Sequence, residues 1–260
     1  MCLGKATRLV EYFMGEPKIY ETTMLLGKAS DSQDITGEVT SEMSISNLDI
    51  DALNQAVLHY SGAILQMPPM VSAIKINGKA LYKMARAGQE IERESRPITI
   101  YSIEILDVKK TENNYLVDMR VKCSPGTYIR TLCYDIGKKL GYPALMARLI
   151  RVESGSFNVK DSVTIECLEE AKNSNTLESC IIDNNTALAK MPFVEINDLE
   201  IEKLLHGGFV AIAPIEDATY RAVYNGGLAA IVEITNNESE CLMKPVKVLM
   251  DLSEINKSIN

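Results

Sequence analysis

The chain has 260 residues, enough for one large domain with a smaller one beside it. Its 46% hydrophobic and 24% charged residues are ordinary for a globular protein. No apolar run approaches the roughly 20 residues that cross a bilayer. The first residues carry no hydrophobic signal region, so we expect a cytoplasmic protein with no membrane partner. Six scattered cysteines without a C-x-x-C pair and only two histidines argue against a zinc cluster.

Charge is distributed unevenly along the chain. The net charge of −8 argues at first against a nucleic-acid partner. Residues 71–160, however, hold 16 Lys or Arg and nine Asp or Glu, so this stretch is basic within an acidic chain. Such a stretch fits a localised face that binds a polyanion. Unequal charge on solvated faces is also common, so both interpretations stay open.

The first hundred residues predict short helices and strands in alternation. Residues 1–15 have an amphipathic pattern that fits a helix, and Asp49 is a suitable N-cap for a helix over 49–60. A proline pair favours an extended chain over 66–70. The other predicted elements are strands at 18–27, 38–43 and 73–77 and a helix at 80–88.

The middle of the chain predicts an antiparallel hairpin that leads into a helix. Residues 96–109 and 114–123 alternate apolar with polar side chains, which is typical of half-buried strands. A Pro-Gly turn follows, and then a helix over 131–140 that Gly141 ends. Residues 145–152 are apolar with two interleaved arginines.

The chain changes character after Ser162. The predicted elements there are an acidic helix at 164–172, short helices at 184–189 and 198–206, and strands at 209–213, 218–224, 228–235 and 242–248. We place a boundary near residue 180, which gives domains over 1–180 and 181–260. The expected fold is α+β: a mixed, largely antiparallel sheet with flanking helices, plus a small C-terminal β subdomain.

One run has the pattern of a ligand-facing rim. In Ser124-Pro125-Gly126-Thr127-Tyr128-Ile129-Arg130-Thr131-Leu132, a strand gives way to a Pro-Gly turn and then to the start of a helix. Enzymes place ligand-contacting groups at such junctions. A plain turn with a surface arginine fits the run as well, because a short motif needs its context.

Three further segments supply that context. They are Cys2-Leu3-Gly4-Lys5-Ala6-Thr7-Arg8; Lys18-Ile19-Tyr20 with Gly27 and Asp31–Gly37; and Gln66-x-Pro68-Pro69-x-x-Ser72-Ala73-x-Lys75, continued to Gly88. The run itself extends to Asp135-x-Gly137 and to Leu149-x-Arg151-x-x-Ser154-Gly155-x-Phe157. In this order and spacing, the four segments resemble the TruB family of tRNA pseudouridine synthases. The resemblance covers residues 2 to about 160 and, more weakly, the tail through Gly207-Gly208 and Lys244-Pro245-x-Lys247-Val248.

The resemblance implies an isomerase that flips a T-loop uridine of tRNA out of its stack and converts it to pseudouridine without a cofactor or metal. Tyr20 and Arg130 are then catalytic: Tyr20 stacks on the flipped base, and Arg130 pairs with the catalytic aspartate. Asp34 holds Arg130 in place, while Tyr128 and Leu149 line the uracil pocket. From the residues alone, Tyr20 also fits a half-buried strand, Asp34 a turn and Leu149 plain core.

The same resemblance assigns RNA contacts outside the pocket. Residues 66–96 correspond to an RNA-clasping insertion, in which we expect Lys75, Lys79 and Arg86 to bind the T-stem-loop of the tRNA. The tail resembles a PUA-type RNA-binding module, and a stabilising β appendage is its alternative interpretation. A monomer is expected for the intact protein.

One catalytic group of the family has no match in the sequence. The family's catalytic aspartate lies in a Gly-x-Leu-Asp-Pro-type loop just before the segment that matches Cys2-Leu3-Gly4, and no Leu-Asp-Pro occurs here. We therefore expect an N-terminally truncated member that is inactive or nearly so alone. An exposed sheet edge should also lower its stability or promote self-association. The alternative is a non-catalytic tRNA-binding or RNA-folding protein.

Overall fold

The computed structural model describes residues 1–76, 78–89, 91–236 and 240–251. These residues form two compact units. The unit Phe13–Asp161 carries the pocket described below, and the other unit joins Met1–Tyr12 to the described residues from Ser162 onward. The compact units thus divide after Asp161, and the expected domain boundary near residue 180 stays a prediction. No described helix is long and apolar enough to cross a membrane.

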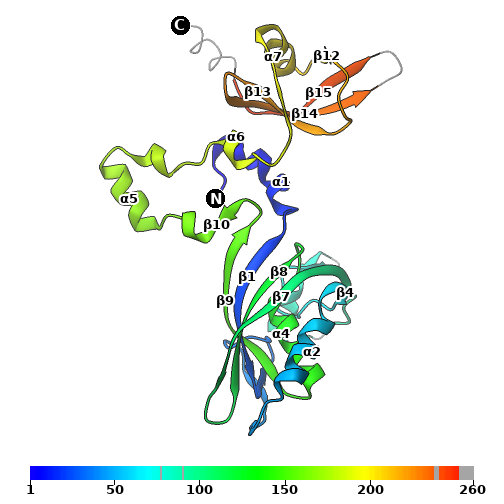
Figure 1. Ribbon diagram of the computed structural model, residues 1–260, viewed down its shortest axis with the longest axis vertical. Helices are drawn as coiled ribbons and strands as arrows, with labels where there is room; N and C mark the ends of the chain where they lie inside the picture. The colour runs from blue at the N-terminus through cyan, green and yellow to red at the C-terminus, as the bar shows by residue number, and fades with distance from the viewer. Residues whose placement is uncertain (77, 90, 237–239, 252–260) are drawn as a thin grey trace. The chain divides into compact units, whose positions relative to one another are not determined.

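A six-stranded antiparallel sheet organises the unit Phe13–Asp161 (Figure 1). Its strands follow the order β10-β9-β1-β8-β7-β4. Their bounds are β1 (Lys18–Leu26), β4 (Gly62–Gln66), β7 (Arg96–Lys110), β8 (Tyr115–Cys123), β9 (Ala144–Ser154) and β10 (Phe157–Asn158). The predicted hairpin of β7 and β8 and the largely antiparallel sheet are confirmed. The sequence did not indicate β4, which precedes the expected extended stretch.

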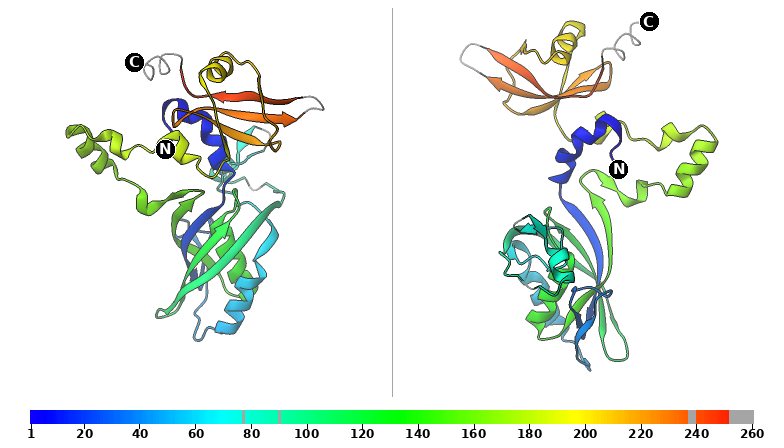
Figure 2. Two further views of the ribbon diagram at one scale, coloured as in Figure 1. Left: turned by 45° about the horizontal axis from the view of Figure 1, so that its top comes forward. Right: turned by 180° about the vertical axis from the view of Figure 1, so that it is seen from behind.

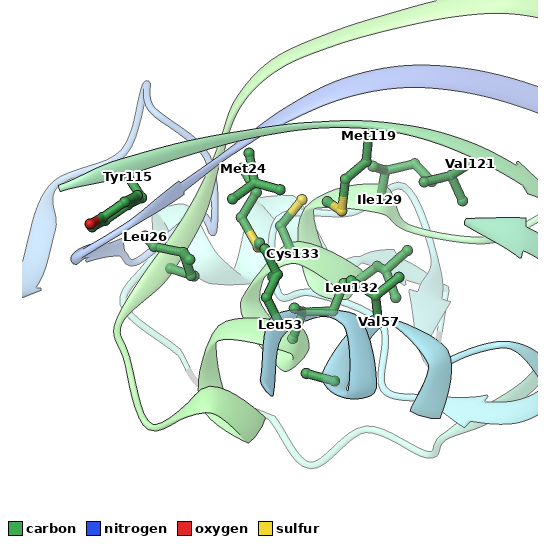
Figure 3. Close-up of a cluster of buried hydrophobic side chains, with 14 of the residues drawn as sticks. Met24, Leu26, Leu53, Val57, Tyr115, Met119, Val121, Ile129, Leu132 and Cys133 are labelled. Atoms are coloured by element: carbon green, nitrogen blue, oxygen red, sulfur yellow. The ribbon is translucent and has the colours of Figure 1, made fainter. Parts of the chain in front are cut away.

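Two helices, α2 (Ile50–His59) and α4 (Ile129–Leu140), cover one face of this sheet (Figure 1). Alternate side chains of β8 are buried toward the helices, including Val117, Met119 and Val121. They pack with helix residues such as Leu53 and Leu132 in a continuous core (Figure 3). Burying such side chains contributes about 1.5–3 kcal/mol each. The core therefore fixes α4 against the sheet.

Local signals explain where these helices lie. Asp49 caps α2 by accepting hydrogen bonds from the N–H groups of Asp51 and Ala52 at 2.9 and 3.0 Å, as the sequence predicted. Gly137 lets α4 approach β9, because a Cβ at this position would lie 2.2 Å from the Cβ of Ala144. Larger residues are therefore excluded from position 137.

The chain before Ser162 also contains several short elements, of which η1 belongs to the other compact unit. They are η1, a 3-10 helix (Gly4–Leu9), α1 (Val10–Met14), β2 (Lys28–Ser30), β3 (Val39–Glu42), β5 (Lys75–Ile76), β6 (Lys79–Ala80), α3 (Leu81–Arg86) and η2 (Val159–Asp161). The helix expected over residues 1–15 thus begins as a 3-10 helix. The strand expected over 73–77 is two residues long where it is described, and residue 77 lies outside the described residues.

A five-stranded sheet organises the other unit, in the order β11-β13-β14-β15-β12 (Figure 2). Its elements are α5 (Ile165–Asn173), η3 (Leu177–Cys180), α6 (Asn184–Ala187), β11 (Phe193–Glu195), α7 (Asp198–Leu205), β12 (Val210–Ile212), β13 (Thr219–Tyr224), β14 (Gly227–Asn236) and β15 (Cys241–Val248). The predicted C-terminal β subdomain is confirmed. Its sheet also contains β11, which precedes α7 in the chain and pairs in parallel with β13.

Candidate active site

A pocket of about 210 Å³ opens where β1 and β9 meet the N-terminus of α4. It is lined by Tyr20, Thr127, Tyr128, Ile129, Arg130, Met146 and Leu149. The volume is below the roughly 300–1,000 Å³ of pockets for drug-sized ligands, so it suits one small ring. Four residues that the sequence singled out therefore lie around a single cavity, although they come from three elements.

Tyr20 and Leu149 supply the sheet side of the pocket. Tyr20 lies in β1, opposite Val121 of β8 and Arg151 of β9, and its ring is half-buried against the core. This burial raises the pKa of Tyr20, so its phenol stays protonated at neutral pH. Leu149 is 40% exposed, which excludes the interpretation of this residue as plain core.

Arg130 reaches across the pocket from the first turn of α4. Its Nη1 lies 3.4 Å from Oδ2 of Asp34, and its Nη2 donates a hydrogen bond to the carbonyl of Val71. Its Cζ lies 5.9 Å from the centre of the Tyr128 ring. The side chains of Arg130 and Asp34 are each 18% exposed, so water screens the pair only in part. The predicted contact between Arg130 and Asp34 is thus present.

Asp34 is held in an ionised form by its own loop. Its Oδ1 accepts hydrogen bonds from the N–H and hydroxyl of Thr36, at 2.9 and 2.5 Å, and from the Ser32 hydroxyl at 3.1 Å. Partial burial favours the neutral acid, but these bonds and Arg130 outweigh it and lower the pKa of Asp34. Asp34 therefore shapes its turn and pairs with Arg130 at once.

The loop that carries Asp34 is docked on β9. The carbonyl of Gln33 accepts from the N–H of Met146 at 3.0 Å, and the Met146 carbonyl accepts from the N–H of Ile35 at 3.0 Å. The Thr131 hydroxyl donates to Oε1 of Gln33 at 2.8 Å, which also ties the loop to α4. These contacts hold the carboxylate against Arg130 although the two residues are 96 positions apart.

The basic segment 67–95 lies outside the pocket lining. Lys75, Lys79 and Lys83 are exposed, which suits contacts with a solvated phosphate backbone. Arg93 instead donates to the carbonyl of Pro68 at 3.0 Å, within the segment. Arg86 ends α3, and its side chain lies outside the described part of the structure. The structure thus separates the predicted backbone-binding residues from the predicted base-binding ones.

Three lining residues were not expected from the sequence: Thr127, Ile129 and Met146. Thr127 and Ile129 flank Tyr128 within the conspicuous run, so their position beside it was the available signal. Met146 had none, because an apolar residue in an apolar strand gives no indication of which cavity it meets.

Within the part of the chain that the structure describes, the pocket has neither a metal site nor a readily ionised thiol beside it. The described residues contain no group of three His, Cys, Asp or Glu side chains placed to hold a metal ion. All six cysteines are free. Burial raises the pKa of Cys133 to about 12 and also raises that of Cys123, so neither ionises readily. The polar groups at this site are the two tyrosines, Thr127 and Arg130 of the lining and the carboxylate of Asp34 that pairs with Arg130.

Two family matches and a set of close relatives agree with this geometry. Residues 1–129 match the family described as TruB family pseudouridylate synthase (N terminal domain), and residues 130–189 match the tRNA pseudouridylate synthase B C-terminal domain. The tRNA pseudouridine synthase B of Bacillus cytotoxicus is 37% identical, over 98% of this chain and 84% of the relative. This chain belongs to the TruB family.

Another TruB relative, the tRNA pseudouridine synthase B of Geobacillus thermodenitrificans, is 41% identical over 82% of this chain and 71% of its own length. Among solved structures, an H/ACA RNP bound to a substrate RNA containing 2′-deoxyuridine matches with a TM-score of 0.68 and 21% identity, over 96% of this chain and 71% of that chain. A Cbf5-Nop10-Gar1 complex matches with a TM-score of 0.67 and 23% identity, over 96% and 72%. Likeness at this level confirms the expected fold. The individual roles of Tyr20, Asp34, Tyr128, Arg130 and Leu149 stay predictions.

Proposed function

We propose that this TruB-family protein acts on a uridine in the T-stem-loop of tRNA and that its pocket receives the uracil ring after the base has left its stack. The observation that carries this proposal is the convergence of Tyr20, Tyr128, Arg130 and Leu149 on one cavity of about 210 Å³. A base can enter such a cavity only when it is flipped out. An aromatic wall then contributes about 1–3 kcal/mol of stacking.

The reaction that fits this site is an isomerisation to pseudouridine. The bond between N1 of uracil and the ribose C1′ breaks, and a bond from C5 to the same C1′ forms. The proton lost from C5 is balanced by one gained at N1, so the reaction consumes no oxidant or reductant. Tyr20 is suited to stack on the base. Because its phenol is protonated at neutral pH, it is suited to assist removal of the C5 proton as a hydrogen-bonding group and not as the base that takes the proton.

Arg130 is suited to orient a carboxylate that attacks or supports the sugar. Its planar guanidinium can hold a carboxylate through two parallel hydrogen bonds, which a lysine cannot do. Among the described residues, Asp34 is the carboxylate that pairs with Arg130, and its Oδ1 already accepts three hydrogen bonds from Ser32 and Thr36. We therefore propose that this polypeptide binds its uridine but turns it over slowly, because Asp34 is not available as the catalytic carboxylate.

RNA outside the pocket is proposed to contact the basic segment. Lys75 and Lys79 are exposed on β5 and β6, and Arg86 ends the following helix. Phosphate contacts of this kind fix the register of an RNA without reading its sequence. The C-terminal β unit, as a PUA-like module, is a second candidate surface for RNA.

A tritium-release assay tests the proposed chemistry. T-stem-loop RNA labelled with tritium at C5 of uridine loses its label to water when the C5–H bond breaks. We expect binding of this RNA with little release of tritium. Robust release by this chain would contradict the proposed slow turnover while supporting pseudouridine formation. The absence of both binding and release would contradict the function itself, and binding without any release would favour a non-catalytic tRNA-binding protein.

A further inference from the structure

A buried amide side chain from outside α4 forms hydrogen bonds with the backbone at the N-terminus of this helix. Gln66, the last residue of β4, is only 3% exposed. Its Nε2 donates to the carbonyl of Tyr128 at 3.0 Å, and its Oε1 accepts from the N–H of the same residue at 2.8 Å. One side chain therefore pairs with both backbone groups of a single pocket residue, much as a neighbouring strand would.

Tyr128 depends on an external partner because of its place in the helix. It is the N-cap of α4, and its side chain makes no capping hydrogen bond. Backbone groups at the start of a helix lack partners within the helix. The Tyr128 carbonyl accepts from the N–H of Leu132 at 3.1 Å, whereas its N–H is directed at Gln66. Replacing Gln66 by an apolar side chain removes that acceptor.

Tyr128, the residue to which Gln66 is hydrogen-bonded, lies in the middle of the pocket wall. Thr127, Tyr128, Ile129 and Arg130 are consecutive and make up four of the seven lining residues. The turn before them is tied to β7, where Thr99 accepts a hydrogen bond from the N–H of Ser124 at 2.8 Å. A shift of the Tyr128 backbone would therefore move its ring and Arg130 together.

Gln66 also lies where the basic segment begins. Its backbone pairs with Arg96, so the two residues close the base of the segment 67–95. Within that segment, the carbonyl of Val71 accepts a hydrogen bond from Arg130. The pocket wall is thus linked to the basic segment through Arg130 and Val71, and to the residue just before that segment through Tyr128 and Gln66.

We propose that Gln66 is a positioning residue of the pocket. Its amide holds Tyr128 and Arg130 where a flipped uracil meets them, so it supports binding of the base and leaves binding of the RNA backbone unaffected. This inference rests on the proposed function, because it requires a pocket that takes a uridine. Gln66 itself does not line the cavity.

Two RNAs separate base binding from backbone binding. One is a T-stem-loop with uridine at the target position, and the other is the same loop with an abasic site there. The affinity ratio, defined as the dissociation constant for the abasic loop divided by that for the uridine loop, reports the contribution of the base to binding by the full chain. Gln66→Met keeps the length of the side chain and removes both hydrogen bonds. We expect this variant to lower the ratio by about fivefold, the equivalent of one to two net hydrogen bonds, and to leave affinity for the abasic loop unchanged.

Two controls exclude a general loss of stability or of RNA affinity. Ile98→Val trims a buried residue of β7, next to β4, without touching the Gln66–Tyr128 hydrogen bonds. It should lower the melting temperature and leave the ratio unchanged. Lys75→Gln should weaken binding of both loops alike. The backbone amide of Tyr128 should also exchange its hydrogen faster in Gln66→Met than in Ile98→Val.

A second variant adds a pH readout. Gln66→Glu keeps the acceptor for the Tyr128 N–H, but its carboxylate at neutral pH faces the Tyr128 carbonyl without a proton to donate. Burial raises the pKa of such a carboxyl, so mild acidification should restore the donor and raise the ratio. A ratio that stays at the wild-type value in Gln66→Met would overturn the inference alone. Equal affinity of the wild-type chain for the two loops would overturn the proposed function and, with it, this inference.

Discussion

Two arginines, one from each compact unit, show two different uses: Arg221 is buried, and the side chain of Arg130 is 18% exposed beside the pocket. Arg221, in β13 of the C-terminal unit, is 7% exposed. Its guanidinium donates to the carbonyls of Met191, Asn185 and Ala189, at 2.9, 2.9 and 3.4 Å, and also to the Asn185 side chain. Its Cζ lies 5.5 Å from the Phe193 ring centre. Arg221 thus fastens the segment 185–193 to the sheet.

Arg130 has fewer partners and a cavity beside it. It contacts one carboxylate and one carbonyl, from Asp34 and Val71, and its side chain lines the pocket. The comparison shows that burial of an arginine does not by itself indicate a site. A structural arginine directs its donors at backbone carbonyls, whereas Arg130 stays next to space that a ligand can enter. The predictions below test this difference, in order of decreasing effect.

Replacement of Arg221 should have the largest effect, and the effect should be on stability. Arg221→Met leaves three backbone carbonyls without their donor, and each buried unsatisfied group costs about 1–3 kcal/mol. Because solvent can reach part of the opened site, we expect a loss of about 3 kcal/mol in the free energy of unfolding, measured by urea denaturation. The uridine-to-abasic affinity ratio should not change.

Arg120→Met is the matched control for that prediction. Arg120 lies on the exposed face of β8 and pairs with Glu21 at 2.8 Å, and its side chain is 47% exposed. Exposed ion pairs contribute little to stability, because water and salt screen them. If the two replacements destabilised the chain equally, the structural role of Arg221 would be contradicted.

Replacement of Arg130 should act on the pocket and hardly on the fold. Arg130→Lys keeps the charge but removes the planar fork and its placement beside the Tyr128 ring. We expect the uridine-to-abasic ratio to fall about tenfold, which corresponds to about 1.4 kcal/mol, and the free energy of unfolding to change by under about 1 kcal/mol. Competition binding with the two loops measures the first quantity. A ratio unchanged in Arg130→Lys but lowered in Arg120→Lys would contradict the assignment.

Helix α4, which carries Arg130, also contains Asp135, a carboxyl whose burial disfavours its charged form. Burial raises the pKa of Asp135 to about 6, against a weaker opposing effect of Lys138. The unfolded value is about 3.9, so the folded state favours the protonated acid. The protonated Asp135 carboxyl therefore contributes to the free energy of unfolding. This contribution is fully present below about pH 4 and is lost as the pH rises through about 6.

Asp135→Asn should therefore stabilise the chain modestly at neutral pH. We expect a gain of about 1 kcal/mol at pH 7, after allowance for partial exposure of the side chain. The gain should vanish near pH 3, where the wild-type carboxyl is mostly protonated in both the folded and the unfolded state. Urea denaturation at both pH values measures it. Asp118→Asn is a suitable comparison, because the Asp118 carboxylate already accepts a hydrogen bond from the Thr23 hydroxyl at 2.5 Å and lies 3.9 Å from Nζ of Lys109, so its replacement should bring no gain. A gain in Asp135→Asn that persisted at pH 3 would contradict the account.

Local patterns predicted much of the fold because they depend on neighbouring residues. The alternation in β8 follows from the side-chain period of a strand, and the Asp49 cap of α2 follows from hydrogen bonds to residues two and three positions away. The sequence did not predict β11, because a strand of three residues is too short to show an alternation of polar and apolar side chains. Its parallel pairing with β13 also depends on the tertiary fold. The strand bounds differ by a residue or two, as expected at frayed ends.

The pocket was predictable only in part. Tyr20, Tyr128, Arg130 and Leu149 were identified through the family resemblance, and the structure brings them to one cavity. Residue types alone left Tyr20 and Leu149 open to ordinary structural interpretations. The docking of the Asp34 loop on Met146 and the brace from Gln66 join residues far apart in the chain. Such contacts carry no local signal, so only the structure shows them.

The central claim is that the pocket takes a flipped uracil, and the affinity ratio of the wild-type chain tests it most directly. Titration of the full chain with T-stem-loop RNA, at fixed salt, gives dissociation constants for the loops with uridine and with an abasic site. Stacking of about 2 kcal/mol against an aromatic wall predicts tighter binding of the uridine loop by about thirtyfold. Equal dissociation constants for the two loops would contradict the claim.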